Sequence, residues 1–502
     1  MNTTNPPSAP VIADRACGVV LASAAGDALG AGYEFGPPLP PLTPVGMDGG
    51  GAFGWEPGEW TDDTQMALAI LSVLADGEAD LARIESNFRA WYDSDPADVG
   101  NQTRRVLDVP GPLAERAASY TAAHPTNAAG NGSLMRTGPV ALAHPRHPAA
   151  IATLATSVSE LTHPDVDCVA ACVLWSVAID HTVHHAPASG VAWDWVSAFE
   201  PGLQQLDADT RRRWRTLIEE ATRSTALDFP NNGWVVHAFQ AALAAITSTP
   251  VPDGVTAGSH LRLSLDEVVR AGGDTDTVAA IAGALLGARW GATAIPLRWR
   301  RRIHGRRTYA EPAIRAADLE RLARVAAVGG RPDLDGWPVV ESMIPTYAAE
   351  WSIPAHRVRI DGVAFGNVSA LEAALADGVD TVVSLCRMGN AEVGLGVEHH
   401  ALGLIDSTPD DNPNAVLLIA DIADQVQRFV DEGRRVFVHC VHAQHRTPTV
   451  AAAWLHRHRG LTADEALDRA AAELNRPRGF LSDAVRQLHQ IPFGTTDESE
   501  TS

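Results

Sequence analysis

The sequence contains no lysine, and all 39 of its basic residues are arginine. A Schiff-base lysine, a pyridoxal-phosphate anchor and the lysine of a nucleoside-triphosphatase phosphate loop each require an amine, so all three mechanisms are excluded. Acidic residues number 61, which gives a net charge of −22. This balance argues against broad electrostatic binding to nucleic acid or to an anionic membrane, although a local group of arginines can still bind a small anion.

Cysteine is also scarce. The five cysteines are too few and too scattered for a disulfide framework, and no Cys-x-x-Cys zinc pair occurs: Cys17, Cys168, Cys172, Cys386 and Cys440. The first ten residues hold three prolines and no basic residue, unlike a secretory signal. No apolar run approaches the roughly 20 residues that span a bilayer. We therefore expect a protein of a reducing compartment, the cytoplasm, with no membrane partner.

Length and periodicity predict two domains. The chain has 502 residues, enough for two or three domains. From Val11 to Ala327 alanine and leucine recur at helical spacing and few segments alternate as strands do, which predicts an all-α domain over residues 11–327. A helix is expected after Trp60, and a capping box at Ser264–Glu267 predicts another that ends at Gly272. A further helix from Thr277 carries two glycines four residues apart, which permit close helix approach.

After Gly329–Pro332 the pattern changes. Residues 328–350 have the composition of a linker, and short β-like runs then alternate with helices, which predicts an α/β domain over residues 351–490. The expected strands are 358–360, 381–385 and 436–439, and the expected helices are 369–376, 414–432, 447–458 and 462–474. Residues 1–10 are expected to form a flexible arm and residues 491–502 a disordered tail.

Two acidic clusters mark the first domain, at Trp60–Thr64 and at Gly272–Thr277. Asp and Thr at the first turn of a helix ordinarily serve as caps. Two such clusters in an apolar setting would repel each other unless a cation were bound, and hard oxygen ligands favour Mg²⁺, Mn²⁺ or Ca²⁺ over zinc. The residues alone leave both interpretations open.

Six motifs follow one another in a characteristic order. They are Gly26–Phe35 (GDALGAGYEF), Thr61–Thr64 (TDDT), Gly100–Arg104 (GNQTR), Gly130–Arg136 (GNGSLMR), Thr162–Pro164 (THP) and Gly272–Thr277 (GGDTDT). On these motifs the chain resembles the ADP-ribosylglycohydrolase family. The resemblance implies an all-α fold with a centre of two Mg²⁺ or Mn²⁺ ions, no organic cofactor, and cleavage at C1″ of the distal ribose of ADP-ribose. It implies as metal ligands Thr61, Asp62, Asp63, Asp274, Asp276 and Thr277.

The resemblance also implies roles in catalysis and binding. Glu34 occupies the place of a mobile glutamate of the family and is expected to be the acid/base residue, with Asp62 or Asp63 as a competing base; the alternative for Glu34 is an ordinary surface glutamate. The diphosphate is expected to bind the run Gly130, Asn131, Gly132 and Ser133. Trp234 and His237 depart from the family's usual residues. We expect His163 to be structural, not a ligand.

A second motif lies near the C-terminus, where Val436–Cys440 reads as an apolar strand and Arg446 opens a helix six positions on. A buried core cysteine with a surface arginine is the plain alternative. In a strand–loop–helix setting, by contrast, the N–H groups of the loop and of the helix N-terminus would point to the same site. Such N–H groups lower the pKa of a thiol and bind a phosphate dianion. The stretch from about Arg359 to Leu488 resembles dual-specificity and related cysteine phosphatases.

This second resemblance implies Cys440 as nucleophile, Arg446 as phosphate ligand and Thr447 as an aid to thiolate departure. Asp406 is the expected general acid, with Asp410 and Asp411 in reserve. The loop glycine usual in such proteins is here Ala443, which would cost about 1 kcal/mol if that position needs a positive φ.

We thus expect a bifunctional enzyme that joins a metal-dependent ADP-ribosyl hydrolase to a cysteine phosphatase-like domain. Its expected substrates are an ADP-ribosylated protein, nucleic acid or small molecule, and a phosphorylated compound, for instance ADP-ribose 1″-phosphate, at the second domain. One alternative is a binding module for ADP-ribose and phosphate whose second domain is catalytically weak or inactive. Another is a metal-dependent phosphoesterase in the helical domain.

Overall fold

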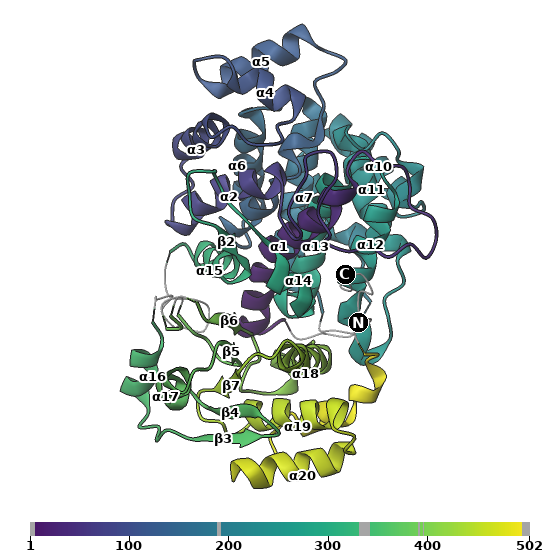
Figure 1. Cartoon of the computed structure of the whole chain (residues 1–502). Helices are drawn as coiled ribbons and strands as arrows, with labels where there is room; N and C mark the ends of the chain where they lie inside the picture. Colours follow the sequence, from purple (N-terminus) through teal and green to yellow (C-terminus); the bar gives the residue numbers. More distant parts are fainter. Residues whose placement is uncertain (1–5, 188–191, 331–341, 390–391, 395, 494–502) are drawn as a thin grey trace.

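The computed structural model describes residues 6–187, 192–330, 342–389, 392–394 and 396–493. The chain forms a helical region, up to residue 330, and a sheet region, from residue 342, stacked one on the other (Figure 1). The predicted all-α fold of the first region is confirmed apart from one two-residue strand pair. Its elements are α1 (Ala9–Gly30), α2 (Asp62–Ala75), α3 (Leu81–Asp93), α4 (Asn101–Leu107), α5 (Leu113–Ala123), α6 (Pro148–Glu160), α7 (Val166–His185), α8 (Trp195–Ala198), α9 (Glu200–Leu203), α10 (Ala208–Ala221), α11 (Val235–Ser248), α12 (His260–Arg270), α13 (Thr275–Trp290), α14 (Leu297–Arg302), α15 (Ala316–Ala326), β1 (His304–Gly305) and β2 (Ile314–Arg315).

The sheet region contains a five-stranded sheet of order β3-β4-β7-β5-β6, in which only the β3–β4 pair is antiparallel. Its elements are α16 (Ile344–Glu350), β3 (Arg357–Ile360), β4 (Val363–Asn367), α17 (Leu371–Ala376), β5 (Thr381–Ser384), β6 (Glu398–Ala401), α18 (Ala415–Asp431), β7 (Val436–Cys440), α19 (Arg446–His458), α20 (Ala463–Leu474) and α21 (Ser482–Arg486). Alternation sends Val383 and Val438 into the core beneath α18 and α19, while Val382 and Phe437 pack with α17 on the other face.

The central helices α1 and α13 are apolar around their whole circumference and pack against each other along their length. Glycines permit this contact, as predicted for Gly283 and Gly287. A Cβ atom at Gly283 would overlap the carbonyl oxygen of Ala22, and one at Gly287 would overlap that of Gly18. The two backbones therefore lie closer than side chains would allow, and the N-terminus of α13 is fixed beside the C-terminal half of α1.

Two helices correct the expectation that no segment is long and apolar enough to span a bilayer. The spans Ala9–Tyr33 and Val166–His185 reach mean hydropathies of 1.3 and 1.5. About 78% of each span is buried inside the protein, where α1 and α7 form the middle of the helical region. Length and composition alone thus do not separate these core helices from membrane-spanning ones.

Other expectations need correction. The capping box at Ser264 is wrong, because α12 already begins at His260 and the Ser264 hydroxyl lies inside the helix, 3.3 Å from Nε2 of His260. Helix α1 begins at Ala9, inside the predicted arm, and α16 occupies the end of the predicted linker. The remaining parts of the predicted arm, linker and tail at residues 1–5, 331–341 and 494–502 lie outside the described residues.

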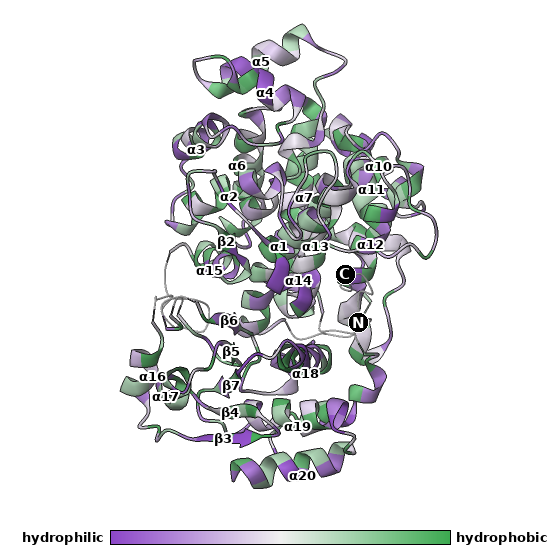
Figure 2. Ribbon diagram, in the orientation of Figure 1, coloured by the Kyte–Doolittle hydropathy of each residue, from purple (hydrophilic) through white to green (hydrophobic). Residues whose placement is uncertain are grey.

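The helical region contacts the sheet region through α14 and the turn before it. Leu297 is buried in the apolar core of the sheet region, beside α18. The side chain of Asn414 donates from Nδ2 to the carbonyl oxygen of Trp290 at 2.6 Å and to Oγ1 of Thr293 at 2.9 Å. Figure 2 shows that α14 itself is largely hydrophilic where it lies between the two regions.

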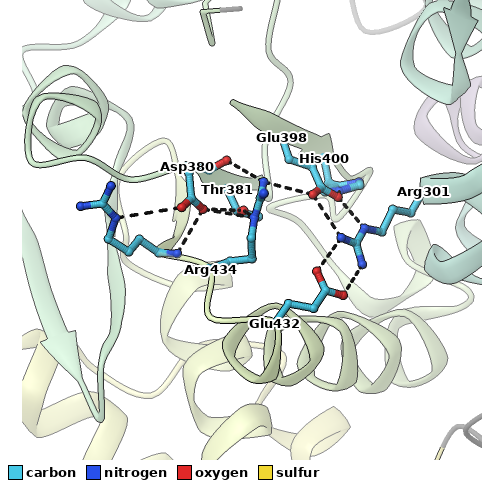
Figure 3. A network of polar contacts seen from close by, with 8 residues as sticks. Arg301, Asp380, Thr381, Glu398, His400, Glu432 and Arg434 are labelled. Atoms are coloured by element: carbon cyan, nitrogen blue, oxygen red, sulfur yellow. Dashed lines mark hydrogen bonds and ion pairs between the residues drawn. The ribbon is translucent and has the colours of Figure 1, made fainter. Parts of the chain in front are cut away.

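An ion-pair network extends this contact (Figure 3). Arg301 of α14 reaches Glu398 of β6 at 2.6 Å and Glu432 after α18 at 2.6 Å. Arg434 donates to Glu398 at 3.2 Å and lies 3.3 Å from Asp380. Each arginine bridges two acidic side chains, so an arginine that is already ordered by one ion pair loses less conformational entropy when it forms the second. The network holds the edge strand β6 against the helical region.

Candidate functional site

Asp27, on α1, anchors the first acidic cluster. Its Oδ1 accepts a hydrogen bond from the backbone N–H of Thr61 at 2.9 Å, and its Oδ2 accepts from the N–H of Thr64 at 3.0 Å and from the Thr64 hydroxyl at 2.6 Å. Burial raises the pKa of Asp27 to about 6, while the Thr64 and Thr61 donors act in the opposite direction. Asp27 therefore fixes the N-terminus of α2 against α1. Sequence reasoning assigned it no role, although it lies in the first of the six motifs.

Carboxylates from four segments converge next to this anchor. In one group, Asp27, Asp63 and Asp276 bring oxygens within 4.8 Å of one another. In a second group, Glu34, Asp274 and Asp276 do the same. Asp276 belongs to both, so the groups form one acidic centre at the N-termini of α2 and α13, where the helix dipoles favour negative charge.

Several oxygens of this centre are buried and have no hydrogen-bond partner among the described residues. They are Oε2 of Glu34, Oδ1 of Asp63 and Oδ1 of Asp276. The other oxygen of Asp63 accepts from the hydroxyls of Thr61 at 3.0 Å and Thr277 at 3.3 Å. Buried unpaired carboxylate oxygens are costly unless a cation coordinates them. The donor set therefore fits a hard divalent cation such as Mg²⁺ or Mn²⁺.

The electrostatics of the centre lead to the same conclusion. Burial, followed by the neighbouring carboxylates, raises the pKa of Asp62 and Asp276 well above the usual range, and burial and Asp27 do so for Asp63. Burial, reinforced by Asp98, Asp274 and Asp27, raises the pKa of Glu34 to about 9. A bound cation would offset this repulsion and restore the charged carboxylates.

Asp62 lies outside both three-carboxylate groups. Asp98 hydrogen-bonds to it and, after burial, is the group that most raises the pKa of Asp62, and burial raises the pKa of Asp98 itself to about 6. Sequence reasoning missed Asp98 because its segment, between α3 and α4, carries none of the motifs that attracted attention. Of the predicted ligands, Asp63, Asp274 and Asp276 therefore converge and Thr61 and Thr277 hydrogen-bond to Asp63, whereas Asp62 lies with Asp98 outside the two groups.

The Gly130–Ser133 run also borders the centre. Asn131 donates from Nδ2 to Oδ2 of Asp274 at 2.7 Å and to the carbonyl oxygen of Asn232 at 3.0 Å. The Ser133 hydroxyl is buried and accepts from Ser159 at 2.9 Å. Of the four residues predicted to contact the diphosphate, Asn131 and Ser133 therefore already use their side chains in hydrogen bonds within the protein. Gly130 and Gly132 remain partly exposed.

His163 lies behind those glycines and belongs to neither carboxylate group. Its Nδ1 lies 2.7 Å from the Thr162 hydroxyl, to which Arg136 donates at 2.6 Å. Burial, with a contribution from Arg136, lowers the pKa of His163 to about 3. A neutral histidine that packs on the loop is consistent with the predicted structural role.

Trp234 and His237 lie beside the Gly130–Ser133 run, because Trp234 forms an isolated β-bridge with Gly130. Their rings lie 5.0 Å apart, directly after Asn232, whose Oδ1 accepts from the N–H of Asp274 at 3.0 Å. The departure from the family's usual residues therefore falls next to Asp274 of the acidic centre.

The second candidate site lies at the C-terminal end of β7. Cys440 is fully buried, and its Sγ accepts from the N–H of Ala443 at 3.2 Å. Ala443 has φ +55° and is itself fully buried. The positive φ on which the expected cost of alanine depends is therefore present at this position. The loop between β7 and α19 thus directs one amide, that of Ala443, to the sulfur, in the strand–loop–helix setting that the sequence indicates.

Arg446 begins α19 with its guanidinium directed to the ends of neighbouring strands. Nη1 donates to the carbonyl oxygens of Leu385 at 2.7 Å and Leu404 at 3.0 Å, and Nη2 lies 3.5 Å from Oδ2 of Asp406. The Nε–H group is buried and has no partner among the described residues. The structure therefore brings Asp406 beside Arg446, as expected of a general acid at the same site.

The other predicted residues of this site have different contacts. The Thr447 hydroxyl donates to the carbonyl oxygen of Gly366 at 3.2 Å, on β4. Asp411 accepts from the hydroxyls of Ser407 and Thr408. Asp411 is thus engaged in its own turn, whereas Asp406 contacts Arg446, which favours Asp406 over this reserve.

Comparisons with known proteins assign the helical region. Residues 8–332 match the family described as ADP-ribosylglycohydrolase. The chain is 32% identical over 304 residues to the ADP-ribosyl-[dinitrogen reductase] glycohydrolase of Rhodospirillum rubrum, covering 58% of this chain and 90% of that protein. It is 27% identical over 295 residues to the ADP-ribosylarginine hydrolase Tri1 of Serratia proteamaculans, covering 57% of this chain and 74% of that protein.

A solved structure described as "Crystal structure of Tk-PTP in the active form" covers 27% of this chain and 97% of its own, at 25% sequence identity and a TM-score of 0.23. The family match ends at residue 332, so the sheet region lies outside it.

Proposed function

The chain belongs to the ADP-ribosylglycohydrolase family through residues 8–332, and on that basis we propose that its helical region hydrolyses the bond between an ADP-ribosyl group and its acceptor. The observation that carries this proposal is the convergence of Asp27, Asp63 and Asp276 with Glu34 and Asp274 at one buried centre. The reaction passes through an oxocarbenium-like state at C1″ of the ribose, which requires an oriented sugar, a water molecule and an acid/base group.

Mg²⁺ or Mn²⁺, as two ions, is the proposed cofactor. The residues that would hold it are Asp63, Asp274 and Asp276, together with Thr61, Asp62 and Thr277. When bound, such ions orient the ribose hydroxyls and activate water. Glu34 lies beside Asp274 and Asp276 with one oxygen unpaired, so we assign it the proton transfer at the scissile bond. Asn131 and Asn232 hold Asp274 in place.

The proposed substrates are ADP-ribosylated proteins. The two relatives are named for ADP-ribosylated dinitrogen reductase and for ADP-ribosylarginine, and these names support arginine as the first acceptor to test. ADP-ribosylated nucleic acids and small molecules are the further candidates.

The test is release of free ADP-ribose from ADP-ribosylated arginine, serine and nucleic acid, by protein treated with chelator and then supplied with Mg²⁺ or Mn²⁺. We expect turnover only after metal is restored. Glu34→Gln should lose at least about 100-fold in kcat yet still take up metal, because it removes the proton-transfer group. Asp276→Asn should lose both turnover and metal uptake. The exposed Glu115→Gln is the matched control. Equal turnover by the Glu34→Gln and Glu115→Gln variants, or full activity in chelator, contradicts the proposal.

A second activity is proposed for the Cys440 loop, namely hydrolysis of phosphate monoesters. The supporting observation is the sulfur of Cys440 held by the Ala443 amide at the N-terminus of α19, with Arg446 and Asp406 adjacent. The Cys440 thiolate attacks phosphorus, the ester P–O bond breaks, and the departing alkoxide takes a proton from Asp406. Water then hydrolyses the phosphocysteine to inorganic phosphate and free thiolate.

A chromogenic aryl phosphate tests this second activity. We expect phosphate release that Cys440→Ser abolishes and Asp406→Asn lowers by about 100-fold. Absence of release by the native chain would favour the alternative, a phosphate-binding module without turnover.

A further inference from the structure

A cavity of about 460 Å³ lies between the two regions, on the side of the sheet region where the Cys440 loop begins. Its volume is within the range of small-molecule sites. Both regions supply its wall. The charged lining residues are Asp14, Glu320, Arg321 and Arg324 from the helical region, and Arg387, Asp406 and Arg446 from the sheet region. Val441 and Arg446, on either side of the loop that follows Cys440, also line it.

The charges that face this cavity favour an anion. Four of the seven are arginines, in a protein with a net charge of −22. Glu320 is paired with Arg300, outside the cavity wall, and Asp14 accepts hydrogen bonds from Thr293 at 3.0 and 2.7 Å. Two of the three acidic groups are therefore engaged elsewhere, and the arginines dominate the interior.

Two of these arginines retain capacity for a ligand. The Nε–H group of Arg446, a residue only 7% exposed, has no partner among the described residues and borders the cavity. Arg321 is exposed on α15 and forms no ion pair within the described part of the chain, while Arg324, one turn further along α15, is half-buried. Arginines bind phosphate oxygens in pairs of hydrogen bonds. The cavity thus has arginine groups at two opposite walls.

We propose that this cavity binds a small molecule with two phosphoryl groups, one at Arg446 beside the Cys440 loop and the other at Arg321 and Arg324 of α15. The inference rests on the proposed phosphatase function for the chemistry at the first group and goes beyond it for the second. ADP-ribose 1″-phosphate, which carries a phosphate monoester and a separate diphosphate, presents phosphoryl groups at two such positions. The helical region would then select the substrate of the sheet region by supplying half of its binding site.

The aromatic wall indicates a suitable probe. Tyr347 and Trp351 line the cavity with rings 6.0 Å apart and nearly parallel, a surface on which a nucleobase can stack. Adenosine 3′,5′-bisphosphate and adenosine 5′-monophosphate therefore form a matched pair of ligands that differ by one phosphoryl group.

The experiment is calorimetric titration of the full-length Cys440→Ser chain in chelator, which prevents turnover and metal-dependent binding at the acidic centre. We expect the bisphosphate to bind at least about tenfold more tightly than the monophosphate. Adding Arg321→Gln and Arg324→Gln should erase this difference. Arg105→Gln, at an exposed arginine of α4, should preserve it. Equal affinity for the two ligands, or an unchanged difference in the Arg321/Arg324 variant, overturns the inference.

Phosphate release by the chain with Cys440 intact separates the two proposals. If the bisphosphate binds in an arginine-dependent manner and no phosphate is released, the cavity assignment stands and the phosphatase function fails. If phosphate is released and the arginines have no effect on the preference for a second phosphoryl group, the phosphatase function stands and the cavity assignment fails. Melting temperatures of the arginine variants identify any loss of affinity that comes from unfolding.

Discussion

The carboxylate of Asp421, on α18, accepts a hydrogen bond from the backbone N–H of Leu297 at 2.6 Å, so a half-buried acceptor of the sheet region holds the first turn of α14. Burial raises the pKa of Asp421 to about 6, and the Leu297 N–H acts in the opposite direction. The contact between the two regions therefore contains a group whose charge changes at mildly acidic pH.

Asp421→Asn should make stability less dependent on pH. Asp421 has its raised pKa only in the folded state, so the folded chain binds the extra proton between about pH 4 and 6. The stability that this proton contributes is complete below pH 4 and is lost as pH rises through 6. Asparagine keeps an acceptor without a charge. We expect the variant to gain up to about 2 kcal/mol relative to the native chain between pH 4 and 8, measured as the difference in melting temperature. The variant Asp431→Asn, at an exposed position, should show no such gain. If the Asp421 variant also shows none, Asp421 is not the source of the pH dependence.

Asp276→Asn should stabilise the protein when metal is absent and remove its response to metal. Asp276 is buried among like charges, so a neutral amide relieves repulsion. In chelator the variant should melt a few degrees above the native chain. With millimolar Mg²⁺ or Mn²⁺ the native chain should gain stability by mass action and the variant should not. The exposed Asp253→Asn serves as control and should follow the native chain in both conditions. A metal-induced gain in the Asp276 variant would argue against its role as a ligand.

Ala443→Val should disrupt the Cys440 loop, whereas Ala443→Gly should preserve it. Position 443 has a positive φ and no exposed surface. A β-branched side chain is strongly disfavoured there, so valine should lower the melting temperature and abolish phosphate release. Glycine relieves the strain of alanine but increases the freedom of the unfolded chain, so stability should change by less than about 1 kcal/mol. Native-like loop activity in the valine variant would show that the left-handed geometry is dispensable.

Arg301→Ala should weaken the contact between the regions in a salt-dependent way. Arg301 bridges Glu398 and Glu432, and its removal takes this partner from Glu432 while Glu398 keeps Arg434. We expect a loss of about 1–2 kcal/mol at low ionic strength that shrinks in 1 M NaCl, followed by thermal unfolding. The exposed Arg212–Asp209 pair offers a control, because Arg212→Ala should cost less than about 0.5 kcal/mol. A similar cost for the two variants would mean that the network contributes no more than an isolated surface pair.

Local signals pointed to the acidic clusters because most of their members lie at helix N-termini, where Asp and Thr are recognisable, but the residues alone left helix caps and a metal site open. Asp63, Asp274 and Asp276 were assigned as ligands through the family resemblance of the motifs that contain them. Asp27 was not assigned, because its function depends on α1 lying against the N-terminus of α2, a contact between segments 34 residues or more apart in the chain. Such a contact leaves no periodicity in the sequence.

Two strands of the sheet escaped prediction for related reasons. β6 has the sequence Glu-His-His-Ala and forms part of the polar contact with Arg301 and Arg434, so it lacks the apolar alternation of a strand. β4 follows β3 after a two-residue turn at Asp361 and Gly362, both with positive φ. Strands 381–385 and 436–439, by contrast, are buried on both faces and were recognised from their apolar runs.

The glycine contacts between α1 and α13 extend to the acidic centre itself, because a methyl group at Gly30 would overlap the backbone of Asp276. The spacing between Asp27 and Asp276 is thus set by how tightly two backbones can nest. A side chain at Gly26 or Gly30 would push the two helices apart and separate the carboxylates of Asp27 and Asp276. Glycines that contribute no ligand atom would in this way limit the radius of any cation that the proposed site could hold.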